Sequence, residues 1–187
     1  MHTMETALPE IKVLMPRRIG DIRGFFSEVW NARDFASIGI EAAFVQDNHI
    51  RNPLKGTLRG LHYQLRHPQA KLCRVIQGEV LDVVVDVRHG SPHFGKWESG
   101  ILSAENKREM YVPAGFAHGY LVLSETAEFL YKCSDFYHPE YERGVLWNDP
   151  EIGINWGVQG PLLSDKDRRN PPLSGISLKE LPEYRRG

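Results

Sequence analysis

Two histidines lie in segments whose neighbours are typical of strands and tight turns. His62 ends the run Gly56-Thr-Leu-Arg-Gly-Leu-His62, and His118 follows the turn-forming run Pro113-Ala-Gly-Phe-Ala. An imidazole titrates near neutral pH, so it is suited to removing a proton as a general base. Two imidazoles are one ligand short of the three that a catalytic zinc or iron site normally takes from the protein. The pair therefore favours acid–base chemistry, and a histidine that only satisfies buried hydrogen bonds is the alternative.

The elements that position these histidines are expected to be strands. Short apolar runs recur about every ten residues between Gly, Pro, Asn, Asp and Ser, which is typical of an all-β sandwich or barrel. Residues alternate most clearly in Glu79–Val87, so at least one face of this strand belongs to the core. The predicted strands, about as many as a double-sheet jelly roll requires, are Ile11–Met15, Phe25–Trp30, Ala43–Asn48, Thr57–Gln64, Lys71–Gln77, Glu79–Val87, Lys96–Leu102, Glu109–Val112, Gly119–Leu123 and Ala127–Cys133.

One short helix and an irregular tail complete the prediction. Asn31 as an N-cap and Gly39 as a stop predict a helix between them. Periodicity weakens after Asp149, and we expect 168–187 to be an irregular tail with a helical turn near Leu178–Leu181. A chain of 187 residues can bury one core without disulfides or metal. We therefore predict a single jelly-roll domain over 1–187.

Charge and composition argue against several classes of partner. Lys and Arg number 23 against 24 Asp and Glu, a net charge of −1, which disfavours bulk capture of nucleic acid or an anionic membrane. The two cysteines, Cys73 and Cys133, are too few for a disulfide scaffold. The first residues lack the apolar run of a signal peptide, and Val80–Val87 is far shorter than the ~20 residues of a membrane helix. We expect a cytoplasmic protein.

The spacing of the two histidine segments resembles the two motifs of the cupin superfamily. In cupins, a G-x5-H-x-H strand and a later P-x-G-x-x-H strand face each other inside a small jelly-roll barrel. Where a metal-binding cupin carries its second histidine, this chain has Gln64, and where a fourth ligand would follow it has Val122. The resemblance implies a cupin-like barrel, and the departures predict neither a metal nor another cofactor. A metal-dependent cupin stays open as an alternative, which stoichiometric metal in the purified protein would favour.

A longer series of motifs occurs in order between Arg23 and Asp167. They are Arg23–Glu28, Gln46–Asn48, Leu58–Gln64, Gln69–Leu72, Val83–Arg88, Ser91–Gly95, Leu102–Asn106, Pro113–Gly119, Ala127–Lys132, Leu146–Asp149 and Leu163–Asp167. Together they closely resemble the dTDP-4-dehydrorhamnose 3,5-epimerase family. The resemblance implies a metal-independent isomerase of dTDP-L-rhamnose biosynthesis, acting as a homodimer. Its substrate would be dTDP-4-dehydro-6-deoxy-D-glucose, inverted at carbons 3 and 5 to dTDP-4-dehydro-L-rhamnose.

The same resemblance assigns roles to four residues. His62 matches the family's general base, and the carboxylate of Asp167 would hold its orientation and stabilise the imidazolium. Tyr131 matches the proton donor on the opposite face of the enolate. Lys71 is the cation that would stabilise the enolate oxygen. Without the family match, Tyr131 would be an ordinary core aromatic, and Asp167 would lie in an exposed, charge-rich loop over 165–169.

The substrate-binding residues that the resemblance implies are mostly cationic or polar, as a diphosphate requires, with Tyr137 stacking on the thymine ring. They are Arg23, Glu28, Gln46, Asp47, Asn48, Arg59, His118, Tyr137, Glu142 and Lys166. Strict alternation places Arg59 and His62 on opposite faces of one strand, which conflicts with a shared pocket. Either Gly60 marks a bulge, or Arg59 reaches the rim or a neighbouring subunit's site.

Some residues depart from the family pattern or lie outside it. Ile50 and Asn52 stand where the family usually has serines, and Gly157 replaces a proline, which affects substrate scope or loop shape rather than reaction type. Asp82 and Asp86 are interpreted as structural, since they lie ~13 Å apart on one strand. Two other functions stay open: an epimerase of the same family that inverts one carbon only or takes a different nucleotide sugar, and a non-catalytic module that binds a nucleotide sugar.

Overall fold

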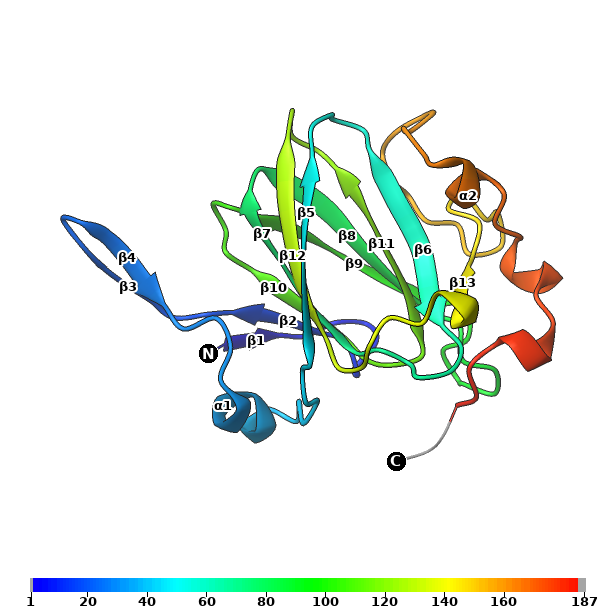
Figure 1. Ribbon diagram of the computed structural model, residues 1–187, viewed down its shortest axis with the longest axis horizontal. Coiled ribbons are helices and arrows are strands. Elements are labelled where there is room, and N and C mark those ends of the chain that lie inside the picture. The colour runs from blue at the N-terminus through cyan, green and yellow to red at the C-terminus, as the bar shows by residue number, and fades with distance from the viewer. Residues whose placement is uncertain (1, 185–187) are drawn as a thin grey trace.

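Two antiparallel β-sheets face each other in the computed structural model, which describes residues 2–184 (Figure 1). The six-stranded sheet has the order β1 (His2–Met4), β2 (Lys12–Met15), β10 (Glu109–Val112), β7 (Lys71–Gln77), β12 (Ala127–Cys133) and β5 (Gln46–Asn52). The five-stranded sheet has the order β13 (Glu142–Gly144), β6 (Leu58–Gln64), β11 (Phe116–Val122), β8 (Glu79–Asp86) and β9 (Trp97–Ser103). The prediction of an all-β, cupin-like jelly-roll barrel with few short helices is confirmed.

A separate two-stranded hairpin, β3 (Arg18–Asp21) and β4 (Gly24–Ser27), projects away from both sheets (Figure 1). The predicted helix is α1 (Ala32–Ser37), and the Asn31 side chain caps it by accepting from the backbone N–H groups of the next turn. Within the described residues, no helix is both long and apolar enough to cross a bilayer.

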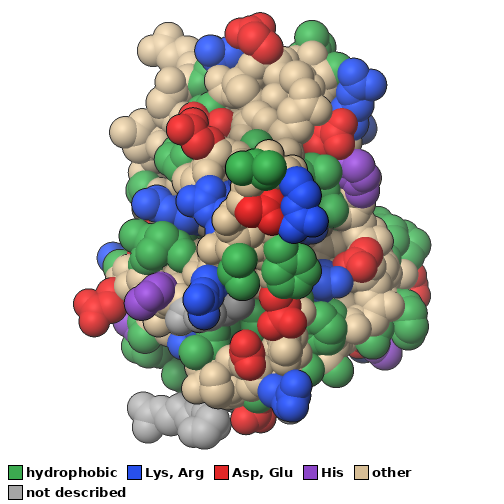
Figure 2. All heavy atoms as spheres, turned by 90° about the vertical axis from the view of Figure 1, so that its left-hand side faces the viewer, with side chains coloured by type: hydrophobic (Ala, Val, Ile, Leu, Met, Phe, Trp, Pro, Cys, Tyr) green, Lys and Arg blue, Asp and Glu red, His purple; other side chains and the backbone are tan. Residues whose placement is uncertain are grey.

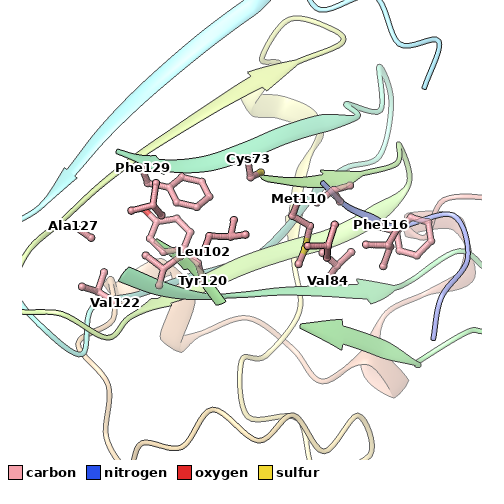
Figure 3. Packing of buried hydrophobic residues seen from close by; sticks show 14 of the residues in the cluster. Cys73, Val84, Leu102, Met110, Phe116, Tyr120, Val122, Ala127 and Phe129 are labelled. Carbon is pink, nitrogen blue, oxygen red and sulfur yellow. The ribbon is translucent and has the colours of Figure 1, made fainter. Parts of the chain in front are cut away.

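The core lies between the two sheets and extends beyond them. Val80 and Val84 of β8 belong to one buried cluster with Phe129 and Met110 of the six-stranded sheet. Figure 3 shows Val84, Met110 and Phe129 in this cluster. The other face of β8 is buried as well, because the chain after β13 covers the outside of the five-stranded sheet with residues such as Trp156. The predicted alternation of β8 therefore separates two buried faces.

Every predicted strand overlaps an observed one, and the differences lie at the ends. The segment predicted over Ala43–Asn48 forms β5 three residues later, and the one predicted over Gly119–Leu123 begins at Phe116. The short strands β1, β3 and β13 were not predicted, since three or four residues carry too little alternation to be recognised.

The C-terminal segment is more ordered than its sequence indicates. It contains the four-residue helix α2 (Asp165–Arg168) and two 3₁₀ turns, Leu173–Gly175 and Leu178–Glu180, the second of which confirms the predicted helical turn. Leu173 and Leu181 are buried against the outside of the five-stranded sheet. Residue 1 and the end of the predicted tail, 185–187, lie outside the described residues.

Candidate active site

A cavity of about 410 Å³ opens between the two sheets beside α2. One wall consists of β6 and β11, and the other of β7 and β12, so that side chains from both sheets meet across it. Its lining includes seven of the residues named from the sequence, which are Arg59, His62, Lys71, His118, Tyr131, Lys166 and Asp167.

His62 and Asp167 form a hydrogen-bonded pair at one side of the cavity. His62 Nε2 lies 2.5 Å from Asp167 Oδ1, although the two residues are 105 positions apart. Asp167 is 3% exposed, because α2 packs against β6 and turns its carboxylate inward. Ser164 caps this short helix by accepting from the Asp167 N–H at 3.1 Å. Burial alone would raise the pKa of Asp167, but the hydrogen bond with His62 holds that pKa below its ordinary value.

The opposite wall carries Tyr131 and Lys71. The two residues lie on neighbouring strands, β12 and β7, and Lys71 Nζ is 5.8 Å from the centre of the Tyr131 ring. Burial raises the pKa of Tyr131 well above its ordinary range, so the phenol holds its proton at neutral pH. The wall facing His62 therefore carries a protonated hydroxyl beside a cation.

A β-bulge allows Arg59 and His62 to line the same cavity. Along β11, only one residue separates the partner of His62 from the partner of Arg59, whereas two residues separate them on β6. The extra residue falls at Gly60, where φ is +116° and a Cβ atom would approach the Gly119 Cα to 2.6 Å. The bulge interpretation is confirmed, and Asn52 Oδ1 accepts from Arg59 Nε at 2.9 Å.

His118 belongs to a second histidine–carboxylate pair, deeper in the barrel. Its Nε2 lies 2.9 Å from Asp82 Oδ1 and 3.8 Å from Cys73 Sγ, and all three residues are buried. Their donor atoms lie within 4.8 Å of one another, which is close enough for a metal ion. Burial, however, raises the pKa of Cys73, and zinc requires the thiolate, so this donor set fits a metal poorly.

Tyr137 and Glu142 lie at the mouth of the site, around a smaller hollow of about 90 Å³ that also touches His62. The Tyr137 hydroxyl donates to Glu142 Oε2 at 2.6 Å, and this bond raises the pKa of Tyr137 to about 12. Lys166 pairs with the same carboxylate, whose other oxygen is 3.8 Å from His62 Nδ1. Gln46 Oε1 accepts from the Tyr137 N–H at 3.3 Å. A chain of polar contacts thus runs from the mouth to His62.

Comparison with known proteins agrees with this geometry. The family model described as dTDP-4-dehydrorhamnose 3,5-epimerase matches residues 5–175. The chain belongs to this epimerase family. The dTDP-4-dehydrorhamnose 3,5-epimerase of Pseudomonas aeruginosa is 56% identical over 171 residues, which are 90% of this chain and 94% of the relative. The predicted enzyme class, an isomerase, is confirmed at the level of the family.

Solved structures include relatives with more than one specificity. The dTDP-6-deoxy-D-glucose-3,5-epimerase of Legionella pneumophila, in complex with dTDP-4-keto-L-rhamnose, is 46% identical with a TM-score of 0.95, covering 99% of each chain. A 3'-monoepimerase of Streptomyces bikiniensis, in complex with dTDP-quinovose, is 36% identical with a TM-score of 0.89, covering 98% of this chain and 93% of that one. Both the double and the single epimerase therefore share this fold.

Within the described chain, neither the cavity nor the smaller hollow is lined by five residues that the epimerase family pattern names, which are Arg23, Glu28, Gln46, Asp47 and Asn48. Asp47 points to the outer face of β5, where it pairs with Lys132 at 2.9 Å, while its neighbours on either side point the other way. Arg23 lies on the hairpin, where its side chain is 84% exposed and pairs with Asp21. Glu28 follows the same hairpin and accepts from Asn31 at 3.1 Å.

Two residues that sequence reasoning left out of the candidate site lie behind its walls and contact residues that line it. Asp82, interpreted as structural, contacts His118, whereas Asp86 does pair with Arg88 in a structural role. The signal was available, since an unpaired acid on the inward face of a core strand needs a partner. Asn52, noted only as a departure from the family, orients Arg59, and no local pattern announces that contact.

Proposed function

We propose that this protein inverts carbons 3 and 5 of dTDP-4-dehydro-6-deoxy-D-glucose and so forms dTDP-4-dehydro-L-rhamnose. The observation that carries the proposal is the placement of His62 and Tyr131 on opposite walls of one cavity. Inversion requires that a proton leave one face of a planar intermediate and return to the other. A base on one sheet and a protonated hydroxyl on the other supply that arrangement.

In the proposed reaction, the ketone at carbon 4 acidifies the hydrogens on the two flanking carbons. Asp167 holds His62 through Nε2, so Nδ1 is the nitrogen free to take the proton. The electron pair of the broken C–H bond moves into the enolate, and the Lys71 ammonium stabilises its oxygen. Tyr131 then gives its proton to the opposite face of the carbon. The imidazolium on His62 is stabilised by the ionised carboxylate of Asp167.

The nucleotide is proposed to lie along the polar residues at the mouth. Arg59 and Lys166 line the cavity and provide cations for the diphosphate. Tyr137 is 51% exposed and presents a ring on which thymine can stack. Gln46 accepts from the Tyr137 N–H and donates to Asn48 Oδ1 at 3.1 Å, so both residues would contact the base or the sugar.

Proton NMR of the product distinguishes the proposed function from the single-carbon alternative. The purified chain is incubated with dTDP-4-dehydro-6-deoxy-D-glucose, and the ring protons at carbons 3 and 5 are followed. The proposal predicts inversion at both. Inversion at one carbon would assign the protein to the specificity of the 3'-monoepimerase relative. Binding of the sugar nucleotide without any turnover would contradict catalysis.

We also propose that the protein acts as a homodimer in which the β3–β4 hairpin covers a second copy. Ile19, Ile22, Phe25 and Phe26 of the hairpin are all more than half exposed, an apolar surface that an isolated chain leaves in water. Figure 2 shows the face from which the hairpin projects, with hydrophobic side chains among Lys and Arg. Such a hairpin would carry Arg23 and Glu28 to the partner's site.

The free, buried thiols Cys73 and Cys133 fit a cytoplasmic enzyme.

Complementation between variants tests this exchange. Arg23→Ala and His62→Ala are each expected to lower turnover strongly. If the hairpin serves the partner's site, a mixed dimer contains one site with both residues intact, so mixing the two inactive variants restores part of the activity. A mixture as inactive as its components, from chains shown to exchange subunits, would contradict the proposal.

A further inference from the structure

Two segments beside the active site are held together by one buried side chain. Gln64, at the end of β6, donates from Nε2 to the carbonyl oxygens of His67 at 2.5 Å and Phe136 at 3.1 Å. Its Oε1 accepts from the backbone N–H of His138 at 2.8 Å. The residue is 6% exposed. Since one amide fixes both backbone segments, the side chains that they carry are held close together.

Three of these side chains bring metal-binding donor atoms to one place. One ring nitrogen of His67, one of His138 and a carboxylate oxygen of Asp135 all lie within 4.8 Å of one another. The two imidazole rings are stacked, with centroids 4.4 Å apart and an interplanar angle of 23°. Because the lone pair of an imidazole lies in the plane of its ring, one of the two stacked rings must turn about the bond between Cβ and the ring for both to bind one ion. Two imidazoles and a carboxylate form a ligand set that zinc and neighbouring divalent metals accept.

The distances fit a shared ion better than a direct bond. His67 Nδ1 lies 3.4 Å from Asp135 Oδ2, whereas a hydrogen bond between an imidazolium and a carboxylate spans about 2.7–2.9 Å. Two ligand atoms that each lie about 2.0–2.1 Å from a tetrahedral zinc ion are about 3.3 Å apart. On the other histidine, Nδ1 of His138 lies 3.6 Å from Glu140 Oε1, so a second carboxylate stands beside the group. A carboxylate behind a ligating histidine is the common outer-shell arrangement.

We propose that His67, Asp135 and His138 bind a divalent cation of the zinc type at a site separate from the catalytic cavity. The three side chains are 52%, 36% and 33% exposed, so water completes the coordination. Tyr137 lies between two of the ligands in sequence, and its hydroxyl contacts Glu142. A bound ion would therefore fix the segment that presents Tyr137 at the mouth of the active site. The proposed epimerisation does not use this ion.

Isothermal titration of the untagged, full-length chain with zinc chloride tests the proposal. We expect one zinc ion per chain to bind saturably at this site. His67→Ala, Asp135→Asn and His138→Ala should each weaken binding by at least the 10–100-fold that is typical for loss of an outer-shell partner. Cobalt(II) should give visible absorption bands of a low-symmetry nitrogen and oxygen site, and these bands should disappear in the same variants.

His49→Ala is the matched control. His49 is also exposed and lies 2.9 Å from a carboxylate, that of Glu128, but it belongs to neither group of three converging donors. Zinc affinity should be unchanged in this variant. A wild-type chain that binds no zinc would overturn the proposal. Zinc that is retained by all three site variants would also overturn it, and would place the ion elsewhere, for instance at Cys73, Asp82 and His118.

Discussion

Two histidines on neighbouring strands each pair with an aspartate, and the two pairs differ in how exposed they are. His62 and His118 are direct partners across β6 and β11, and each contacts a carboxylate through Nε2. The His62 side chain is 26% exposed, and its partner Asp167 comes from the separate helix α2. The His118 side chain is 7% exposed, and its partner Asp82 lies on β8 in the same sheet.

This difference fits the proposed reaction, in which one pair transfers a proton and the other supports the site. A base must reach the carbon and release its proton again, so it has to be open to the cavity, as the partly exposed side chain of His62 is. The pair of His118 and Asp82 is enclosed by Cys73 and Phe129, and it shapes the floor on which the sugar would rest. We therefore assign proton transfer to the exposed pair, and we assign to the buried pair the role of positioning the sugar.

The largest effect is expected from removing the exposed imidazole. His62→Ala should leave the fold intact and lower kcat by about 10²–10⁴-fold, since general-base catalysis contributes that much. The other histidine that lines the cavity among the described residues, His118, is far less exposed and cannot take over the role. Turnover is measured by product NMR, with circular dichroism as the check of folding. Near-normal turnover in a folded variant would reverse the roles given to the two pairs.

Asp167→Asn should have the next largest effect. The amide keeps the shape but cannot stabilise the imidazolium, so we expect a loss in kcat of about 10²-fold with little change in KM. The steady-state constants are compared across the neutral pH range. A change confined to KM would mean that Asp167 acts on substrate binding instead of on the base.

Asp82→Asn should produce a smaller loss, about tenfold or less, because the buried pair only positions His118. The effect should fall mainly on KM, while solvent deuterium continues to enter the substrate in step with turnover. If this variant loses as much kcat as Asp167→Asn, the division between a reacting pair and a supporting pair is wrong.

Glu109 extends the comparison to a buried carboxylate that has no histidine partner among the described residues. Burial raises its pKa to about 8, although Arg74 and Lys132 act against the shift. The folded chain therefore keeps a proton that the unfolded chain releases above the ordinary pKa of 4.5. The stability that comes from holding this proton in the folded chain is complete at low pH and is lost as pH rises toward 8. Urea unfolding should show that the free energy of unfolding of the wild type falls relative to that of Glu109→Gln as pH rises from 4.5 to about 8. Parallel plots of this free energy against pH would contradict the assignment.

Much of the fold could be predicted because local patterns and the final packing agree. The alternation in 79–87 gave β8, and Asn31 gave the start of α1. The helix α2 could not be predicted, since four residues have no periodicity and its stability depends on docking against β6. The burial of Asp167 follows from that docking, so its charged neighbours in sequence suggested an exposed loop instead.

The site was predictable where a motif fixes a residue and less so where the fold redirects one. His62, Lys71 and Tyr131 do line one cavity. The direction of Arg59 depends on the bulge at Gly60, which the sequence left open as one of two explanations. The outward position of Asp47 follows from alternation along β5, which turns adjacent residues of the motif Gln46–Asn48 to opposite faces.

Isotope exchange by Tyr131→Phe tests the central claim, that a base and an acid act from opposite walls. The variant and wild type are incubated with dTDP-4-dehydro-6-deoxy-D-glucose in deuterated water, and carbons 3 and 5 are followed by NMR. The account predicts that deuterium still enters the substrate, since His62 can remove a proton and return one to the same face, while inversion falls by a much larger factor. Equal loss of exchange and inversion would contradict it and would leave Tyr131 as a residue that only positions the sugar.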